Sequence, residues 1–357
     1  LQKNILFMDY LQNGITVKFL VKGEEQSSIV RLIDYKNEKN NSFYVVNQFT
    51  FLENGNNRRP DIILFINGLP LVLMELKSPS KDEVGAENAY HQIRNYMQDI
   101  PSIFYYNAIC VISDLSTNKA GTITSGLDRF MEWKTKDGNY EDTAYASFET
   151  FYEGMFQRER LLDILKNFIL FSGGSNSRFK VLAGYHQYFA VRKAIEKAKV
   201  ATKTDGKGGV FWHTQGSGKS YSMVLLSQKI RRKFAGSPTI VILTDRDELN
   251  TQISDTFENC GLLGKTKAAK YIAMSGDDLI TKLQGNPSFI FTLIQKFNKK
   301  NVQPIIPDHD IIIMSDEAHR SQYGIFADNM VNLLPTAARI GFTGTPLLSN
   351  DNITERT

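Results

Sequence analysis

Two carboxylates and a lysine stand at the ends of two short apolar runs in the first half of the chain. Asp61 begins the run at 61–66, and Glu75 and Lys77 end the run at 69–77. Carboxylate oxygens hold Mg²⁺ while leaving coordination sites for water, and a bound metal activates water and stabilises charge on a phosphate. These residue types therefore predict metal-dependent phosphodiester cleavage, in which Lys77 positions the attacking water or stabilises the developing charge.

For this chemistry, a hairpin must bring Asp61 and Glu75 to one face of a sheet. The dipeptide Asn67-Gly68 marks the turn. A strict two-residue turn would pair Asp61 with Met74 and leave Glu75 on the opposite face. A three-residue loop with a bulge would pair Asp61 with Glu75 instead, so we predict the bulged hairpin.

The backbone carbonyl of Leu76 is the third candidate metal ligand, and we expect its side chain to point into the core. A surface hairpin with charged residues at its exposed end would contain the same residue types. Apolar residues on both sides of Glu75 favour a buried strand, where an ionised carboxylate is costly unless it has a partner or a function.

Gln92 and Tyr96 follow in a helical segment, four residues apart and so on one face. The order Asp, Glu-x-Lys, Gln-x-x-x-Tyr resembles the RecB-like branch of the PD-(D/E)xK nucleases. The resemblance implies that Gln92 and Tyr96 support the active site and the DNA backbone; the alternatives are solvent exposure for Gln92 and core packing for Tyr96. The family often adds an acidic residue from a preceding helix, which we assign to no residue.

The sequence HTQGSGKS at 213–220 lies between an apolar run and a helical run, which is the context of a phosphate-binding loop. Glycines let the backbone amides approach an anion at a helix N-terminus. We expect Lys219 at the β- and γ-phosphates and Ser220 on Mg²⁺; a flexible Gly/Ser turn is the alternative. His213 stands where the common pattern has glycine. The candidate ATP-binding residues of the loop are Thr214, Gln215, Gly216, Ser217, Gly218, Lys219 and Ser220.

The apolar run DIIIMSD at 310–316 continues into EAHR. Asp316 is expected to hold Mg²⁺ through water, and Glu317 to activate the attacking water. An acidic pair after a strand can also cap a helix, but the phosphate-binding loop earlier in the chain favours the catalytic interpretation.

The DEAH sequence resembles motif II of superfamily 2 helicases and translocases, which implies that His319 couples the nucleotide site to the rest of a motor. Gln187 stands where that family has an adenine-reading glutamine. LTDRDEL at 243–249 resembles the DNA-contacting motif Ia, and GFTGTP at 341–346 resembles motif III. The implied coupling and DNA-contact residues are Thr244, Asp245, Arg246, His319, Thr343, Gly344 and Thr345.

The elements that must position these residues fall on two sides of a Gly/Ser-rich stretch at 172–178. Before it we expect helices around 84–98 and 159–169 and strands at 42–51, 61–66, 69–76 and 107–113. After it, nearly all-apolar strands alternate with helices, which predicts a parallel sheet covered on both faces; these strands are 208–213, 239–244, 289–294, 310–316 and 338–344. We therefore expect an α/β chain with a RecB-like PD-(D/E)xK domain at 1–171, a linker at 172–178 and a first RecA-like P-loop domain at 179–357, without a second RecA-like domain.

Composition restricts the remaining function classes. The net charge is only +4, so a nucleic-acid surface must be a local patch; the basic stretches at 229–234 and 296–300 are candidates, although solvated helix faces would look the same. Cys110 and Cys260 are far apart and are expected to be reduced thiols. We see no apolar run long enough for a membrane span and no signal peptide.

A RecB-like nuclease ahead of a DEAH-type motor closely resembles the restriction (R) subunit of type I restriction–modification enzymes. The resemblance implies Mg²⁺, ATP, translocation of double-stranded DNA and cleavage away from the recognition site. It also implies a prokaryotic cytoplasmic location and two partners, a methyltransferase (M) subunit and a specificity (S) subunit, with S-adenosylmethionine only on those partners. Residues 1–357 alone are expected to bind nucleotide and to hydrolyse it poorly. The alternatives are another nuclease–motor fusion, such as a type III restriction subunit or a repair helicase–nuclease, and a non-cleaving ATP-dependent DNA remodelling subunit.

Overall fold

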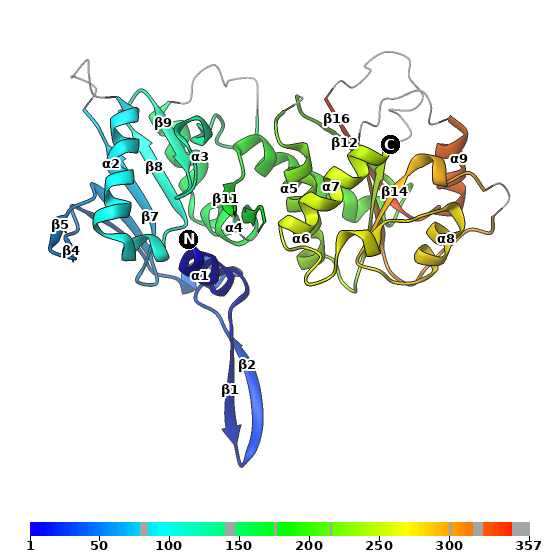
Figure 1. Cartoon of the computed structure of the whole chain (residues 1–357), viewed down its shortest axis with the longest axis horizontal. Helices are drawn as coiled ribbons and strands as arrows, with labels where there is room; N and C mark the ends of the chain where they lie inside the picture. Colours follow the sequence, from blue (N-terminus) through cyan, green and yellow to red (C-terminus); the bar gives the residue numbers. More distant parts are fainter. Residues whose placement is uncertain are drawn as a thin grey trace. The chain divides into compact units, whose positions relative to one another are not determined.

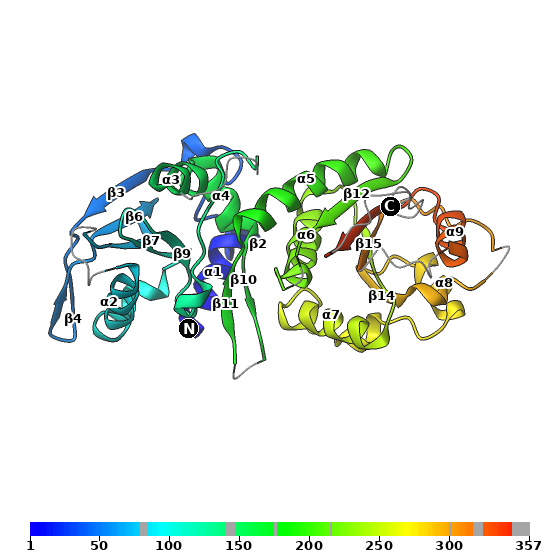
Figure 2. The same ribbon diagram turned by 90° about the horizontal axis from the view of Figure 1, so that it is seen from above.

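The computed structural model describes residues 1–78, 85–139, 147–174, 177–214, 216–299, 302–316 and 324–344. The chain divides into two compact units, one of Leu1–Phe171 with Ser177–Tyr188 and the other of Ser172–Asn176 with Phe189–Thr357. The segment predicted as a linker, 172–178, lies between β10 (Ile169–Ser172) and β11 (Phe179–Leu182), which pair with each other as a hairpin (Figure 2). Among the described residues, no helix is long and apolar enough to cross a membrane.

The first unit is built on a mixed five-stranded sheet with the order β3-β6-β7-β8-β9. Only the pair β7·β8 is parallel. The elements of this unit are α1 (Gln2–Asn13), β1 (Ile15–Val21), β2 (Glu24–Val30), β3 (Phe43–Asn47), β4 (Phe51–Glu53), β5 (Asn56–Arg58), β6 (Ile62–Ile66), β7 (Leu69–Leu76), α2 (Ala86–Asp99), β8 (Ile109–Ser113), β9 (Asn118–Gly121), α3 (Phe148–Phe156), α4 (Arg158–Asn167), β10, β11 and the start of α5 (Tyr185–Ala201).

Helix α2 covers one face of this sheet. Its buried residues Ala89, Ile93 and Tyr96 pack in one apolar cluster with Leu73 of β7 and Cys110 of β8. Because alternate residues of a strand share a face, the position two residues after Leu73 also lies on the side that α2 covers. That position is Glu75.

The β6–β7 hairpin has the predicted register but not the predicted loop. Asn67 and Gly68 have φ of 51° and 79°, as a two-residue type I′ turn requires. The extra residue lies within β7 instead, because Leu64 pairs with Val72 while Phe65 pairs with Pro70. The three-residue loop was therefore wrong, and the bulge was right: beyond it Ile62 pairs with Met74, which brings Asp61 opposite Glu75.

The strand expected at 42–51 is broken. It ends as β3 at Asn47 and resumes as β4 at Phe51. Between them, Gln48 takes the left-handed backbone conformation, with φ of 52°. Non-glycine residues seldom adopt this conformation, so nothing in the apolar pattern of 42–51 indicated a break at Gln48.

Strands β1 and β2 form a separate two-stranded ribbon that extends away from α1 (Figure 1). Every residue of β2 is exposed, and Leu20 of β1 is 74% exposed. A ribbon of this kind gains little from burial and is marginal in water by itself.

The second unit is built on a fully parallel five-stranded sheet with the order β12-β16-β15-β13-β14. Its elements are most of α5, β12 (Lys207–Trp212), α6 (Lys219–Lys233), β13 (Thr239–Thr244), α7 (Asp247–Asn259), α8 (Gly276–Gln284), β14 (Phe289–Leu293), β15 (Ile311–Asp316), α9 (Gly324–Leu333) and β16 (Ala338–Thr343).

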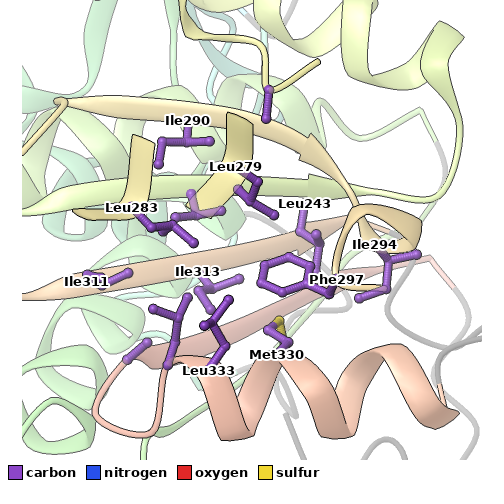
Figure 3. Close-up of a cluster of buried hydrophobic side chains, with 14 residues drawn as sticks. Leu243, Leu279, Leu283, Ile290, Ile294, Phe297, Ile311, Ile313, Met330 and Leu333 are labelled. Atoms are coloured by element: carbon purple, nitrogen blue, oxygen red, sulfur yellow. The ribbon is translucent and has the colours of Figure 1, made fainter. Parts of the chain in front are cut away.

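Helices cover both faces of the parallel sheet. On one face, Leu279 and Leu283 of α8 and Met330 and Leu333 of α9 pack against the strands (Figure 3). On the other face, Ser227 of α6 contacts Met314 of β15, and α7 packs its Phe257 ring against two β14 rings at centroid distances of 5.5 and 5.3 Å. The predicted fold class, an α/β chain with a doubly covered parallel sheet, is confirmed.

Candidate functional site

Asp61 lies immediately before β6, where two hydrogen bonds fix its carboxylate. The backbone amide of Leu76 donates to Oδ2 at 2.8 Å. The side-chain amide of Gln48 donates to Oδ1 at 2.8 Å. Each carboxylate oxygen therefore has one donor and retains lone-pair capacity for a further partner.

Glu75 is 3% exposed, and its two oxygens have different surroundings. Oε1 accepts a hydrogen bond from Lys77 Nζ at 3.0 Å. No donor among the described residues reaches Oε2, which is fully buried. Burial raises the pKa of the Glu75 carboxyl, the negative charge of Asp61 raises it further, and the hydrogen bond from Lys77 acts in the opposite direction.

These residues fit a divalent cation. A buried carboxylate oxygen without a donor is costly, and a cation between Glu75 and Asp61 would supply the missing partner and neutralise two like charges. Among the described residues, no group of three or more His, Cys, Asp and Glu side chains is assembled to hold a metal. The remaining ligands of a Mg²⁺ ion would therefore include water and a backbone carbonyl, for which Leu76 stays our candidate.

Gln92 and Tyr96 lie on α2, and the Tyr96 side chain is buried. The Tyr96 hydroxyl donates to the carbonyl of Arg59 at 3.4 Å, two residues before Asp61. Burial raises the pKa of Tyr96 to about 12, the charge of Glu75 adds to the shift, and a hydrogen bond with Gln92 opposes it. The structure thus brings the five side chains named for this centre, those of Asp61, Glu75, Lys77, Gln92 and Tyr96, to one face of the sheet.

Sequence reasoning missed Gln48, which contacts Asp61 through both its side chain and its backbone. Its amide nitrogen also donates to the carbonyl of Asp61 at 3.0 Å. Glutamine has no special preference for a turn or for a nuclease site, and Gln48 is separated from Asp61 by a second hairpin. No signal in the sequence pointed to this contact.

In the second unit, the phosphate-binding loop joins β12 to α6. Gly216 and Gly218 have φ of 82° and 84°, and α6 begins at Lys219, so the first amides of the helix face the loop. The Nζ atom of Lys219 lies 4.0 Å from Oδ1 of Asp316 at the end of β15. This is the arrangement in which a lysine and a Mg²⁺-binding aspartate flank a nucleotide phosphate.

Strand order places β16 between β12, which leads into the loop, and β15, which ends at Asp316. β16 pairs with β12 on one side and with β15 on the other. The amide of His213 donates to the carbonyl of Thr343 at 3.1 Å, and the indole of Trp212 donates to the carbonyl of Gly344 at 3.3 Å. The segment resembling motif III is therefore bonded directly to the entrance of the phosphate-binding loop.

The segment resembling motif Ia follows β13, which is the other neighbour of β15. Thr244 is buried at the end of the strand, and Arg246 precedes α7. The Arg246 side chain lies 3.7 Å from the Asp245 carboxylate, and Gln295 donates to the Asp245 carbonyl at 2.9 Å.

Several predicted residues cannot be placed in this site. Gln215, Glu317, His319 and Thr345 lie outside the described residues. Gln187 belongs to the first unit, where its Oε1 accepts a hydrogen bond from the amide of Gly184 at 3.1 Å. The site in the second unit is therefore described by its remaining members, including Thr214, Ser217 and Ser220.

Comparison with known proteins gives two family matches. Residues 1–129 match the type I restriction enzyme R protein N terminus, and residues 186–357 match the SWI2/SNF2 ATPase family. The chain is 36% identical to the type I restriction enzyme HindI endonuclease subunit of Haemophilus influenzae, over 99% of this chain and 36% of that protein. It is 35% identical to a protein of Methanocaldococcus jannaschii provisionally named as the MjaIXP endonuclease subunit of a type I restriction enzyme, over 98% of this chain and 35% of that protein. The chain thus spans about a third of the length of these relatives.

Proposed function

The chain belongs to the family of type I restriction enzyme endonuclease subunits, and we propose that it carries the nuclease centre and the ATP-binding half of a DNA-translocating motor. In this proposal, ATP hydrolysis moves double-stranded DNA, and the first unit then cuts it away from the recognition site. The observation that carries the nuclease assignment is the buried Glu75 oxygen that no described donor reaches, opposite Asp61.

The first unit would use its own residues in the following roles. Asp61 and Glu75 would hold Mg²⁺, together with the Leu76 carbonyl; when bound, this ion would supply an activated water and charge stabilisation at the scissile phosphate. Lys77, held at 3.0 Å by Glu75, would stabilise the developing negative charge. Gln92 and Tyr96 would order the carboxylate face of the sheet.

The second unit would bind ATP between the phosphate-binding loop and the end of β15. Lys219 would contact the phosphates, while Ser220 and Asp316 would hold the Mg²⁺ of the nucleotide. Glu317 would activate the attacking water. Support comes from the short distance of 4.0 Å between Lys219 Nζ and Asp316 Oδ1 and from the match to SWI2/SNF2 ATPases.

Conversion of hydrolysis into movement would involve the strands that flank β15. β16 ends at Thr343 and β13 ends at Thr244, and both strands pair with β15. The segments that these residues begin, 343–345 and 244–246, would therefore border the nucleotide site. A DNA strand contacted there would respond to the state of the nucleotide, with His319 as the link from the DEAH segment.

We further propose that the subunit acts in the prokaryotic cytoplasm with a methyltransferase subunit and a specificity subunit. The specificity subunit would read the target, and S-adenosylmethionine would bind only to the modification partners. This division follows from the named family and from the role assigned to each unit.

The proposal is tested on the full-length subunit assembled with its partners and given unmethylated circular DNA that contains one recognition site. We expect cutting only with ATP and Mg²⁺, and product ends distributed over positions far from the site. Product ends confined to a fixed distance beside the recognition site would contradict translocation. Cutting without ATP would contradict the coupling of the two units.

A further inference from the structure

Gln48 interrupts the edge of the nuclease sheet in a conformation that costs free energy. Its φ of 52° belongs to the left-handed region, which is strained for a non-glycine residue. The neighbouring ring of Phe49 packs on Phe51 and Phe65 at centroid distances of 4.9 and 5.6 Å. The turn is therefore held on the sheet by aromatic contacts and is not a free loop.

In this turn, both the backbone and the side chain of Gln48 donate hydrogen bonds to Asp61. The backbone amide donates to the Asp61 carbonyl at 3.0 Å, and the side-chain amide donates to Oδ1 at 2.8 Å. Oδ2 is held by the Leu76 amide at 2.8 Å. Two donors on opposite oxygens fix the rotation of the carboxylate about its Cβ–Cγ bond.

The chemical type of residue 48 suits a metal ligand. A lysine or arginine there would neutralise Asp61 and compete with a cation, and an acidic residue would add a third negative charge beside Glu75. A neutral amide donates one hydrogen bond to the carboxylate and leaves its charge available.

We propose that Gln48 is a positioning residue of the nuclease centre, whose left-handed turn and side-chain amide hold the Asp61 carboxylate so that it and Glu75 share one divalent cation. This inference rests on the proposed nuclease function. It assigns Gln48 no contact with the reacting phosphate; the residue acts through Asp61. Outer hydrogen-bond partners of metal ligands commonly change metal affinity by about 10- to 100-fold when they are removed.

Two substitutions separate the side-chain contact from the backbone conformation. Gln48→Asn keeps a residue that tolerates the left-handed region but is shorter by one methylene and does not reach Asp61. Gln48→Gly removes the side chain and relieves the backbone at the same time. Asn54→Gly is the matched control, because Asn54 has φ of 51° in the neighbouring turn between β4 and β5.

The probe is Mn²⁺, and its binding to the intact 357-residue chain is measured by calorimetry without nucleotide or DNA. All variants also carry Asp316→Asn, which removes the cation ligand of the second unit, and loss of the signal in Glu75→Ala identifies the nuclease site. We expect both Gln48 variants to bind Mn²⁺ about 10-fold more weakly, while Asn54→Gly binds as the parent does. The denaturation midpoint of Gln48→Gly should not fall, which separates lost affinity from unfolding.

Wild-type Mn²⁺ affinity in either Gln48 variant would overturn the positioning role while leaving the nuclease site in place. If the parent chain binds no Mn²⁺, or if Glu75→Ala binds it as well as the parent does, the metal centre itself and the proposal built on it both fail. A second measurement uses the assembled enzyme: the Mg²⁺ concentration for half-maximal cutting should rise in both variants, with cutting at saturating Mg²⁺ changed by only a few-fold.

Discussion

Glu75 is a buried acid, and one of its two oxygens, Oε2, makes no hydrogen bond to the described residues. Burying an ionised carboxylate is costly, so a residue that serves stability alone is seldom a buried acid of this kind. The pKa of Glu75 is raised by burial and by the charge of Asp61. Functional sites commonly contain such perturbed groups. Without a bound cation, we expect the protein with Glu75 to be less stable than a variant with a neutral residue at this position.

The first prediction follows from the raised pKa of Glu75. Because the folded-state pKa of this acid exceeds its unfolded value, the folded state binds more protons just above pH 4.5, and stability falls as pH rises through that window. Glu75→Gln removes this titration, so the stability of the variant relative to wild type should improve from pH 5 to pH 8 in the presence of EDTA. Urea unfolding at the two pH values measures the difference.

The control for this experiment is Glu159→Gln, since Glu159 is exposed on the first turn of α4. Its stability difference from wild type should not change with pH. A Glu75→Gln difference that is flat or declines between pH 5 and pH 8 would contradict the raised pKa.

At the scale of elements, the hairpin turn and the bulge together set the geometry of the proposed nuclease centre. The turn needs φ above zero at Asn67 and Gly68, and the bulge moves the following residues by one position. Without the bulge, Glu75 would point to the face opposite α2.

The turn gives a second prediction. No atom lies within 4 Å of a Cβ added at Gly68, so Gly68→Ala costs only backbone strain, about 1 kcal/mol. Gly23 has φ of 88° and equally open space in the β1–β2 turn, but the exposed ribbon can open locally. In urea unfolding followed through the first unit, Gly68→Ala should lower stability while Gly23→Ala leaves it unchanged. Equal losses in both variants would show that the ribbon unfolds together with the sheet.

A buried lysine joins three further elements of the first unit. Lys180 of β11 donates to Asn4 Oδ1 of α1 at 3.1 Å and to the Asn107 carbonyl before β8 at 2.8 Å. Burial lowers the pKa of Lys180 to about 7. Asn4 in turn donates to carbonyls of Phe104 and Asn107, so one polar cluster ties the N-terminal helix to the sheet.

The third prediction follows from the lowered pKa of Lys180. Between about pH 7 and the ordinary lysine range, the unfolded chain binds a proton that the folded chain releases, so stability rises with pH in this window. The contribution approaches about 1.4 kcal/mol per pH unit, and Lys180→Met should remove it. Urea unfolding from pH 7 to pH 8.5 measures the slope, below the range where the buried Cys110 thiol contributes. The same slope in wild type and variant would show that another group is responsible.

How far the sequence predicts these elements depends on whether their signal is local. Apolar runs such as 239–244 and 311–316 are buried on both faces, so they were readable as parallel strands. The register that places Glu75 opposite Asp61 was predictable, because only that register brings the two carboxylates to one face of the sheet. The position of the bulge at Leu71, the break at Gln48 and the exposed ribbon were not predictable, because each depends on packing or backbone strain that no residue pattern records.

At the scale of the whole molecule, two units with separate hydrophobic clusters carry two separate sites. The first contains the proposed metal centre and the second contains the candidate phosphate-binding loop. Each unit is large enough to unfold cooperatively by itself.

This organisation gives the fourth prediction. Scanning calorimetry of the 357-residue chain should resolve two transitions, and a non-hydrolysable ATP analogue should raise only one of them, by several degrees at about 100 times its dissociation constant. Lys219→Ala should abolish the shift, whereas Lys233→Ala, at the other end of α6, should not. A single transition that moves as a whole would contradict independent units.

The central claim is that one chain holds two separable catalytic sites, and one measurement tests it most directly. The full-length subunit, assembled with its partners on unmethylated circular DNA with ATP and Mg²⁺, is assayed in parallel for linearisation and for ATP turnover. The account predicts that Glu75→Ala abolishes cutting while ATP turnover stays near wild type, and that Lys219→Ala abolishes both. Cutting by Glu75→Ala would contradict the nuclease assignment, and ATP-driven cutting by Lys219→Ala would contradict the motor assignment.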